Sequence, residues 1–335
     1  MSSRRQFLQG LGLTVLGTQI PAFATSDSPS ILKPPRLKSG DTIGLVSPAS
    51  SINKSDLKYI KFQLAQLGLK VKNSAVVLNE YGYLAGSDFD RANDIHRMFA
   101  DPSVQGILAT NGGWGSGRIL SLLDYNLIQN HPKVILGYSD ITALLLGIYS
   151  QTQLVTFHGL VGISFWNPFS VEYWQRLLYQ GEQIFFQNPT RVQVETIHPG
   201  TARGRLIGGN LSIISALVGT PYLPNMNNNI LFVEDIGEDI YRIDRMLNHL
   251  KLSGILNQLS GFIFGQCTRC TKGEGNEPSL TLWQVLLDQI KPLGIPAWYG
   301  SMIGHIQDQF TLPIGIEVEI NAETGTIQML ESAVQ

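Results

Sequence analysis

The fold class is decided by ten residues, Lys133-Val-Ile-Leu-Gly-Tyr-Ser-Asp-Ile-Thr142, which join a short apolar run to an apolar helical segment. The run ends at Gly137, and Ser139 stands on the turn before the segment from Ile141 to Tyr149. A strand–turn–helix of this kind lifts a hydroxyl above the sheet edge and places helix N–H groups beside it. The second glycine of the common G-x-S-x-G elbow is missing, and a Gly-x-Ser turn can also be purely structural. The stretch predicts an α/β fold and makes Ser139 a candidate nucleophile.

Strand-like and helix-like segments alternate on both sides of this stretch. Apolar runs bounded by breakers indicate buried strands, and apolar residues at helical spacing indicate amphipathic helices. Alternation of the two predicts a mostly parallel sheet with helices on both faces, which binds ligands beyond the carboxyl ends of its strands. Asn111 and Ser139 both follow strand ends, so we expect them at the same rim. The expected strands are 42–48, 105–110 and 133–138, and the expected helices are 55–67, 119–127, 141–149 and one opened by a capping box at Ser87-Asp-Phe-Asp90.

The second half of the chain predicts a different, more β-rich unit. The pattern weakens in 166–202, where Asn167-Pro, Gln180-Gly and His198-Pro-Gly interrupt it. We interpret 37–165 as an N-terminal α/β domain with the nucleophile, 166–202 as the inter-domain linker, and 203–331 as a smaller α+β or barrel-like C-terminal domain. Its expected strands include Arg205–Gly208, Asn229–Glu234, Gly261–Gly265 and Ile316–Ile320.

The first 24 residues are typical of a secretory signal peptide. A charged start with Arg4 and Arg5 leads into a short apolar core and an Ala22-Phe-Ala24 cleavage site. The paired arginines resemble the twin-arginine type of signal, and the core falls short of the ~20 residues that a spanning helix needs. We expect cleavage after Ala24, a linker over 25–36, and a mature protein in the periplasm without stable membrane insertion.

Composition disfavours nucleic acids, metals and cofactors. The formal charge is −2 and becomes −4 without Arg4 and Arg5, which argues against binding to a phosphate backbone. The two cysteines stand in Cys267-Thr-Arg-Cys270, which could be a redox pair or half a zinc site. No second cysteine pair exists and the six histidines lack metal-ligand spacing. We therefore expect no metal, no cofactor, and an incidental cysteine pair able to form a disulfide.

A glycine-rich loop, Asn111-Gly-Gly-Trp-Gly-Ser-Gly-Arg118, follows one of the expected strands. Glycines let backbone N–H groups approach a ligand closely, as a phosphate cradle or as oxyanion donors. Neither the dinucleotide spacing G-x-G-x-x-G nor the Gly-Lys-Ser/Thr ending of a P-loop is present. A plain strand–helix turn is the structural alternative. With a candidate nucleophile on a strand end at the same rim, we favour an oxyanion loop.

A serine nucleophile needs a base and a residue that orients the base. The apolar strand Ile230-Leu-Phe-Val-Glu-Asp235 ends in carboxylates, and Glu234 is our candidate for the orienting residue. The ordinary alternative is that Glu234, Asp235, Glu238 and Asp239 cap the helix that begins near Ile240 and favour its positive end. For the base, His305 lies in an irregular glycine-containing loop and is slightly preferred to His158, which also ends a strand.

The following motifs occur in order along the chain: Gly112-Gly-Trp-Gly, Gly137-Tyr-Ser-Asp-Ile-Thr, Phe157-His-Gly, Gly208-Gly-Asn-Leu, Val233-Glu-Asp-Ile-Gly-Glu, Tyr241-Arg-Ile-Asp-Arg-Met-Leu and Gly304-His. Together they resemble the motifs of the LD-carboxypeptidase family of serine peptidases, over about Leu37 to Leu330. The resemblance implies a triad of Ser139, Glu234 and His305, with the backbone N–H groups of Gly113 and Asp140 as oxyanion donors. It also implies a flavodoxin-like or Rossmann-like N-terminal layer, a swivelling-barrel-like C-terminal domain, an active site between them, and a homodimer. Many members have Arg in place of Asn111 and Tyr in place of Trp114, and with Gly112 these two positions lie beside the substrate.

Three functions follow as hypotheses. The first is a serine L,D-carboxypeptidase of the cell envelope that removes the terminal D-alanine of murein tetrapeptides, with a peptidoglycan-derived peptide as its partner. The second is an immunity peptidase of the same family that cleaves peptidyl-nucleotide antibiotics, with Trp114 stacked on the base. The third is a non-catalytic envelope protein that binds peptides in the same cleft.

Overall fold

The computed structural model describes residues 30–273 and 278–335. The expected signal peptide, 1–24, lies outside the described residues, as does 25–29 of the expected linker. Residues 31–335 form one compact unit that contains two β-sheets. The mixed α/β fold class predicted from the sequence is confirmed.

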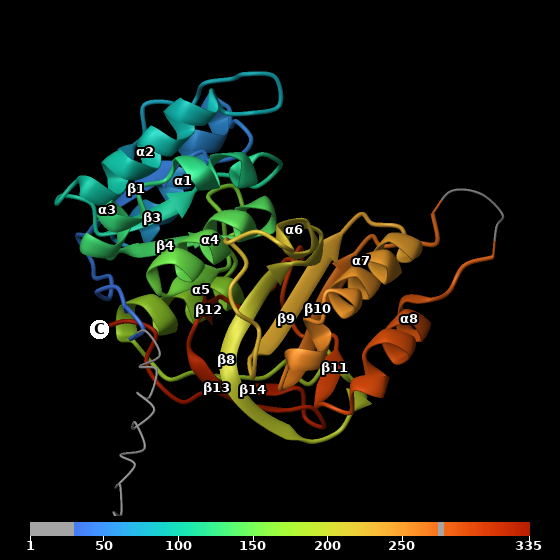
Figure 1. Ribbon diagram of the computed structural model, residues 1–335. Helices are drawn as coiled ribbons and strands as arrows, with labels where there is room; N and C mark the ends of the chain where they lie inside the picture. Colours follow the sequence, from blue (N-terminus) through green and yellow to red (C-terminus); the bar gives the residue numbers. More distant parts are fainter. Residues whose placement is uncertain (1–29, 274–277) are drawn as a thin grey trace, which may run out of the picture. The chain divides into compact units, whose positions relative to one another are not determined.

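The first sheet is parallel except at one edge (Figure 1). Its strands follow the order β12-β5-β4-β3-β1-β2, and only β12 runs antiparallel, against β5. The elements are β1 (Thr42–Val46), β2 (Lys70–Asn73), β3 (Gly106–Ala109), β4 (Val134–Gly137), β5 (Thr156–His158) and β12 (Leu312–Ile314).

Helices cover both faces of this sheet. One face carries α2 (Asp88–Ala100), η1 (Ser116–Leu122), α3 (Tyr125–Asn130) and α4 (Thr142–Thr152), which contact one another. Right-handed crossovers place α1 (Lys54–Gln66) on the other face. There the Tyr179 hydroxyl of η3 (Arg176–Gln180), which follows α5 (Pro168–Gln175), donates to the carbonyl of Leu67.

The α2 helix shows how the sequence sets a local boundary. Ser87 is its N-cap and accepts a hydrogen bond from the Asp90 amide at 3.1 Å, which satisfies a donor at the helix start. Its predicted apolar face is buried (Ala92, Ile95, Met98 and Phe99).

The helix expected over 119–127 is wrong as a single element. The chain forms the 3₁₀ helix η1, breaks at Leu123, and restarts as α3. Asp124 causes the restart because its carboxylate accepts from the Leu127 amide at 2.9 Å, while its own amide donates to His96 Nε2 at 2.9 Å. The second bond is a tertiary contact that periodicity does not reveal.

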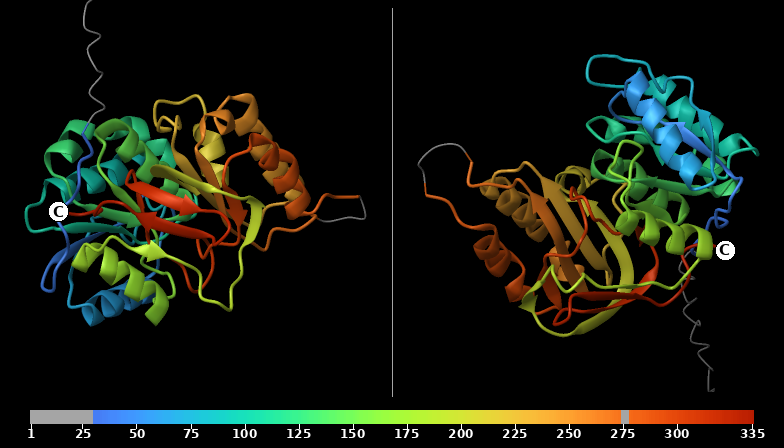
Figure 2. Two further views of the ribbon diagram at one scale, coloured as in Figure 1. Left: turned by 90° about the horizontal axis from the view of Figure 1, so that it is seen from below. Right: turned by 180° about the vertical axis from the view of Figure 1, so that it is seen from behind.

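The second sheet has parallel central strands and antiparallel flanks (Figure 2). Strands β8 to β11 are parallel, and the order is β6-β14-β13-β8-β9-β10-β11-β7. Helices α7 (Ile240–Leu252) and α8 (Leu282–Gln289) contact each other beside it, and α6 (Leu211–Leu217) follows β8. The strands are β6 (Phe185–Phe186), β7 (Glu195–His198), β8 (Thr201–Asn210), β9 (Ile230–Ile236), β10 (Gly261–Thr268), β11 (Ala297–Tyr299), β13 (Glu317–Asn321) and β14 (Thr326–Met329).

The chain crosses between the two sheets more than once. The segment 166–202, expected as a linker, holds α5, η3, β6 and β7. Near the end of the chain β12 returns to the first sheet, where Leu312 pairs with His158. Consequently the edge of the first sheet is supplied by residues that follow most of the second.

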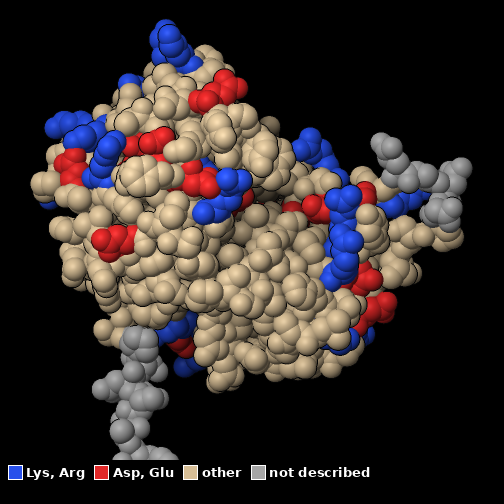
Figure 3. All heavy atoms as spheres, turned by 45° about the horizontal axis from the view of Figure 1, so that its top comes forward, with Lys and Arg blue, Asp and Glu red and all other residues tan. Residues whose placement is uncertain are grey.

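The surface carries no dominant charge on the face that Figure 3 shows, where acidic and basic side chains form small mixed groups beside a broad uncharged area. Within 30–273 and 278–335 no helix is long and apolar enough to cross a bilayer.

Candidate active site

The turn that carries Ser139, the candidate nucleophile, is tight, and the serine adopts an unusual backbone conformation. Strand β4 ends at Gly137, where a side chain has no room because a Cβ atom would lie 2.7 Å from Ile141 Cγ2. Ser139 has φ = 62°, in the left-handed region that costs a non-glycine residue about 1–2 kcal/mol. Such strain is retained where the surroundings enforce it, often at functional sites. The half-buried Ser139 hydroxyl therefore stands at the carboxyl end of the sheet, directly before α4.

Three predicted residues form one hydrogen-bonded chain. His305 Nε2 lies 3.0 Å from Ser139 Oγ, and His305 Nδ1 lies 2.7 Å from Glu234 Oε2. The carboxylate of Glu234 is fully buried at the end of β9, so its proximity assigns the imidazole proton to Nδ1 and leaves Nε2 to accept from the serine. Gly304 permits this approach, since a Cβ atom there would lie 2.7 Å from Glu234 Oε2. The chain of contacts joins three segments that are distant in sequence.

Asn210 ties the buried acid to the nucleophile helix, and sequence reasoning did not single it out. Its amide donates to Glu234 Oε1 at 3.2 Å and to Asp235 Oδ1 at 3.1 Å. Its backbone N–H donates to Thr142 Oγ1 at 3.0 Å, and its Oδ1 accepts from the Ile213 amide as the N-cap of α6. The available signal was an asparagine at a strand-to-helix junction, in Gly208-Gly-Asn-Leu211.

Asp235 follows Glu234 directly, but its carboxylate bonds to Asn210, Ser212 and Ile236 and not to His305. Its carboxylate accepts from Asn210, from the Ile236 amide, and from both the amide and the hydroxyl of Ser212. Burial, reinforced by the charge of Glu234, raises the pKa of Asp235 to about 6. Of the four carboxylates that could cap α7, Asp239 occupies the N-cap position, without a side-chain cap bond, whereas Asp235 bonds to Asn210 and Ser212 instead.

The glycine-rich loop lies against the nucleophile. A Cβ atom on Gly112 would be 3.3 Å from Ser139 Oγ, so the loop backbone borders the hydroxyl. Gly113 has φ = 105°, and a Cβ atom there would collide with Ser50 Oγ at 2.0 Å. The Ser50 amide fixes the loop by donating to the Gly112 carbonyl at 3.1 Å. Position 113 therefore needs glycine, and position 112 leaves little room for a side chain.

Two buried ionic side chains fix the far end of the same loop. Asp140 Oδ2 accepts from the Ser116 amide at 2.8 Å, and Arg91 Nη1 donates to the Gly115 carbonyl at 2.9 Å. The guanidinium of Arg91 is fully buried and pairs with Asp88. Burial raises the pKa of Asp140, while the Ser116 hydrogen bonds oppose that rise. The loop and the serine turn are thus fixed to each other by Asp140.

His158, the alternative base, is placed outside the hydrogen-bonded chain. Its ring is completely buried on β5 against Tyr138 and Phe232, and neither ring nitrogen has a hydrogen-bond partner among the described residues. Burial lowers the pKa of His158 to about 4, so the ring is neutral near pH 7. The geometry therefore favours His305.

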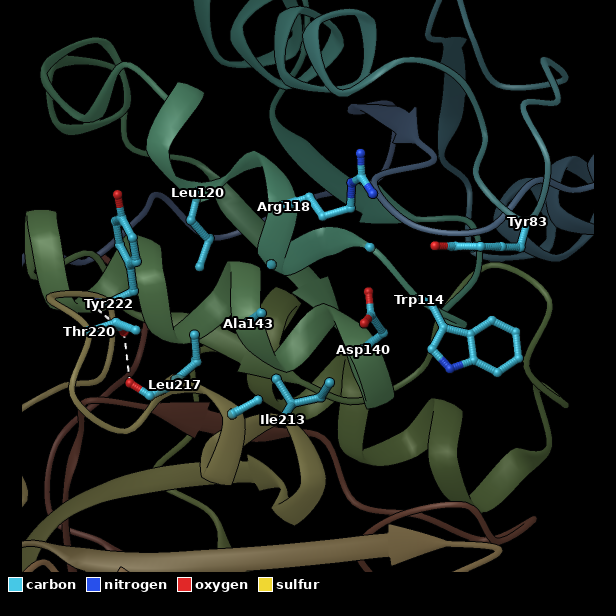
Figure 4. Close-up of a pocket in the computed structure, with 13 residues that line it drawn as sticks. Tyr83, Trp114, Arg118, Leu120, Asp140, Ala143, Ile213, Leu217, Thr220 and Tyr222 are labelled. Carbon is cyan, nitrogen blue, oxygen red and sulfur yellow. Dashed lines mark hydrogen bonds between the residues drawn. The ribbon is translucent and has the colours of Figure 1, made fainter. Parts of the chain in front are cut away.

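A pocket of about 440 Å³ opens beside the nucleophile turn (Figure 4). Tyr83 and Trp114 stand at one end of it and Tyr222 at the other, with the side chain of Asp140 between them. Trp114 is 67% exposed and meets Tyr83 edge-on, with ring centroids 6.3 Å apart. The half-exposed Asn111 begins the loop that carries Trp114. The pocket thus has an aromatic wall at one end, and Asp140, the residue after Ser139, is part of its lining.

The cysteine pair forms a disulfide between Cys267 and Cys270 at the end of β10. Among the residues that the structure describes, no group of three or more His, Cys, Asp or Glu side chains is arranged to hold a metal ion.

Comparison with protein families gives matches over most of the described chain. Residues 43–159 match the model of the LD-carboxypeptidase N-terminal domain, and residues 203–320 match that of the LD-carboxypeptidase C-terminal domain. Over 299 residues the chain is 39% identical to a probable murein peptide carboxypeptidase of Bacillus subtilis, covering 88% of this chain and 93% of the relative. It is 28% identical to the microcin C7 self-immunity protein MccF of Escherichia coli, covering 87% and 94%.

Solved structures show the same likeness. The structure of MccF in complex with glutamyl sulfamoyl guanosine superposes with a TM-score of 0.82 at 27% identity, covering 91% of this chain and all of the other. That of the muramoyltetrapeptide carboxypeptidase from Oxalobacter formigenes superposes with a TM-score of 0.75 at 26% identity, covering 86% and 97%.

Proposed function

This chain belongs to the LD-carboxypeptidase family, and we propose that it is a serine L,D-carboxypeptidase that removes the terminal D-alanine from murein tetrapeptides. The observation that carries the proposal is the hydrogen-bonded chain from Ser139 through His305 to Glu234. Relatives named as murein peptide and murein tetrapeptide carboxypeptidases support the substrate class.

In the proposed reaction His305 Nε2 takes the proton of Ser139 Oγ, and the oxygen attacks the carbonyl carbon of the bond between the L-centre of the diamino acid and D-alanine. Glu234 stabilises the imidazolium that forms. The backbone N–H groups of Gly113 and Asp140 donate to the oxyanion. The imidazolium then protonates the leaving amine, D-alanine departs, and an acyl-enzyme on Ser139 remains. Water, deprotonated by the same base, releases the shortened peptide.

The substrate lies outside the cytoplasm in this proposal. Arg4 and Arg5 in a signal-like leader support export by a twin-arginine route to the periplasm, where peptidoglycan is accessible. We also propose a homodimer, by analogy with the family.

Release of D-alanine from purified murein tetrapeptide tests the proposal. The wild type should release it, and Ser139→Ala should lose at least about 10³-fold in kcat with its fold intact. Trapping of an acyl group on Ser139, seen as a mass increase of the intact protein, separates catalysis from mere peptide binding. Undiminished release by Ser139→Ala would show that the nucleophile is a different residue.

A second candidate function is hydrolysis of peptidyl-nucleotide antibiotics. The exposed ring of Trp114, which lines the same pocket as Asp140, could stack on a nucleobase, and the MccF structures support this substrate class for a relative. Parallel turnover measurements on murein tetrapeptide and on an aminoacyl-adenylate analogue distinguish the two. Preference for the adenylate would replace the murein assignment.

A further inference from the structure

The end of β10 holds the loop that carries His305. The Gln266 amide donates to the Ile303 carbonyl at 2.9 Å, and two residues further on the Thr268 hydroxyl donates to the carbonyl of His305 at 2.9 Å. Thr268 is therefore a side chain bonded directly to the backbone of the proposed base. The ring of His305 is fixed by Glu234 and its main chain by this hydroxyl.

Thr268 itself lies inside the disulfide loop. Cys267 and Cys270 are joined, and the Cys270 amide donates to the Cys267 carbonyl at 3.3 Å, which closes a turn of four residues. Arg269 in this turn has φ = 56°, a conformation that a non-glycine residue keeps only when its surroundings impose it. On its other side the turn is held by the Gly237 amide, which donates to the Thr268 carbonyl at 2.9 Å. The cross-link thus encloses the residue that contacts His305.

We propose that Thr268 is a positioning residue for His305 and that the Cys267–Cys270 disulfide keeps it in position, so that full activity requires the oxidised pair. The inference rests on the proposed role of His305 as the base. Displacements of about 1 Å in a catalytic group can cost up to 10²-fold in rate, so a turn that no longer holds the main chain of His305 in place would slow the reaction.

A dithiol reductant can convert the disulfide form of the Cys267–Cys270 pair into the dithiol form. Both cysteines are half-buried at the surface end of β10, so their sulfurs are within reach of a small reagent. A dithiol thiolate attacks one sulfur to form a mixed disulfide and then closes on itself. The reductant becomes a disulfide, the two cysteines become thiols, and two electrons and two protons are transferred. The turn around Arg269 then has no covalent closure.

Substitution of Thr268 tests the positioning role. We expect Thr268→Val to lower kcat roughly three- to tenfold, as the loss of one hydrogen bond does, with KM unchanged because the substrate contacts stay. Thr268→Ser keeps the hydroxyl and should stay within about twofold of the wild type. The matched control is Thr271→Val, since the exposed Thr271 lies outside the cross-linked turn and its hydroxyl, among the described residues, accepts from the Gly273 amide at 3.3 Å. Thermal unfolding of each variant checks that it is folded.

Reduction tests the disulfide. Dithiothreitol treatment, followed until two thiols per chain are titrated, should lower kcat as Thr268→Val does, and reoxidation should restore it. The double variant Cys267→Ser/Cys270→Ser should start at the low rate and ignore the reductant. Equal kcat in the reduced wild type, the double variant and the untreated protein would overturn the inference.

The rate at which a fluorophosphonate labels Ser139 gives a readout without substrate. A wild type that labels but releases no D-alanine disproves the murein proposal alone, and the labelling rates of reduced protein and Thr268→Val then decide the positioning role. A wild type that does neither disproves both.

Discussion

Asn210→Ala tests most directly the hydrogen bonds by which Asn210 connects the buried carboxylate of Glu234 to helix α4, which follows Ser139. The side chain is 5% exposed and makes three hydrogen bonds: to Glu234, to Asp235 and, as the helix cap, with the Ile213 amide. Loss of the cap costs about 1 kcal/mol. Each bond to a buried carboxylate contributes about 1.5–3 kcal/mol, and because the two share one donor group their effects do not add fully. We expect a loss of about 3–4 kcal/mol in the free energy of unfolding, hence a melting temperature lower by roughly 5–6 °C for a chain of this length.

Activity should fall further than stability explains. Without the amide, one oxygen of Glu234 loses its donor, the carboxylate can turn, and the His305 ring loses its fixed orientation. A misplacement of this kind lowers kcat roughly 10- to 100-fold. Measured below the new melting temperature, kcat for D-alanine release isolates this effect from unfolding.

Asn210→Asp separates the effect of the helix cap from that of the two hydrogen bonds to Glu234 and Asp235. Aspartate keeps an oxygen for the Ile213 amide but removes both donated bonds and brings a third carboxylate to Glu234 and Asp235, so its destabilisation should exceed that of alanine at pH 8 and shrink on acidification. The control Asn225→Ala removes an exposed side chain that accepts from the Asn227 amide and should cost less than about 0.5 kcal/mol. The proposed role of these two hydrogen bonds is refuted if the free energy of unfolding of Asn210→Ala lies within about 0.5 kcal/mol of the wild-type value and its kcat within twofold.

Three further predictions concern pH and the glycine loop. The pKa of Asp235 is raised from 3.8 to about 6, so the unfolded chain releases this proton first as pH rises. The free energy of unfolding should therefore fall by up to about 3 kcal/mol between pH 4 and 6. Urea titrations of Asp235→Asn should show no such fall over this pH range. The pKa of His158 is lowered from 6.5 to about 4, so on acidification the unfolded chain takes up this proton first, and the free energy of unfolding falls by up to about 3 kcal/mol from pH 6.5 to 4. His158→Phe should remove that loss and keep kcat within about threefold of the wild type. A kcat as low as that of His305→Ala would instead make His158 the base. Gly113→Ala should lower kcat by at least about 10²-fold with little change in substrate affinity, since its methyl group would displace the loop from Ser50; a wild-type rate would exclude the loop from oxyanion binding.

The sequence was most informative where local rules and burial agree. Strands β1, β3 and β4 are apolar runs bounded by breakers, and the Ser87 cap marks the start of α2, so residue patterns locate them. The strand–turn–serine unit at Ser139 was predictable for the same reason: its geometry is local.

Contacts between distant segments could not be read in this way. Asn210 donates to Thr142 of α4 and to Glu234 of β9 and accepts from Ile213 of α6, and only the folded chain shows that these three elements converge on it. The break at Leu123 depends on a bond to His96 from another helix. Strand β12 has three residues, too few for a period to be recognised.

The return of β12 to the first sheet has a consequence for biosynthesis. Ser139 and His305 are 166 residues apart, and β12 follows His305. At translation rates of about 5–20 residues per second, a nascent chain that has already exposed the serine waits roughly 10–30 seconds for its base. Throughout that interval β5 is an open edge able to pair with other chains. Under the proposed mechanism the protein is therefore synthesised inactive and with an unprotected strand, and it gains its activity only when the last tenth of the polypeptide closes the sheet.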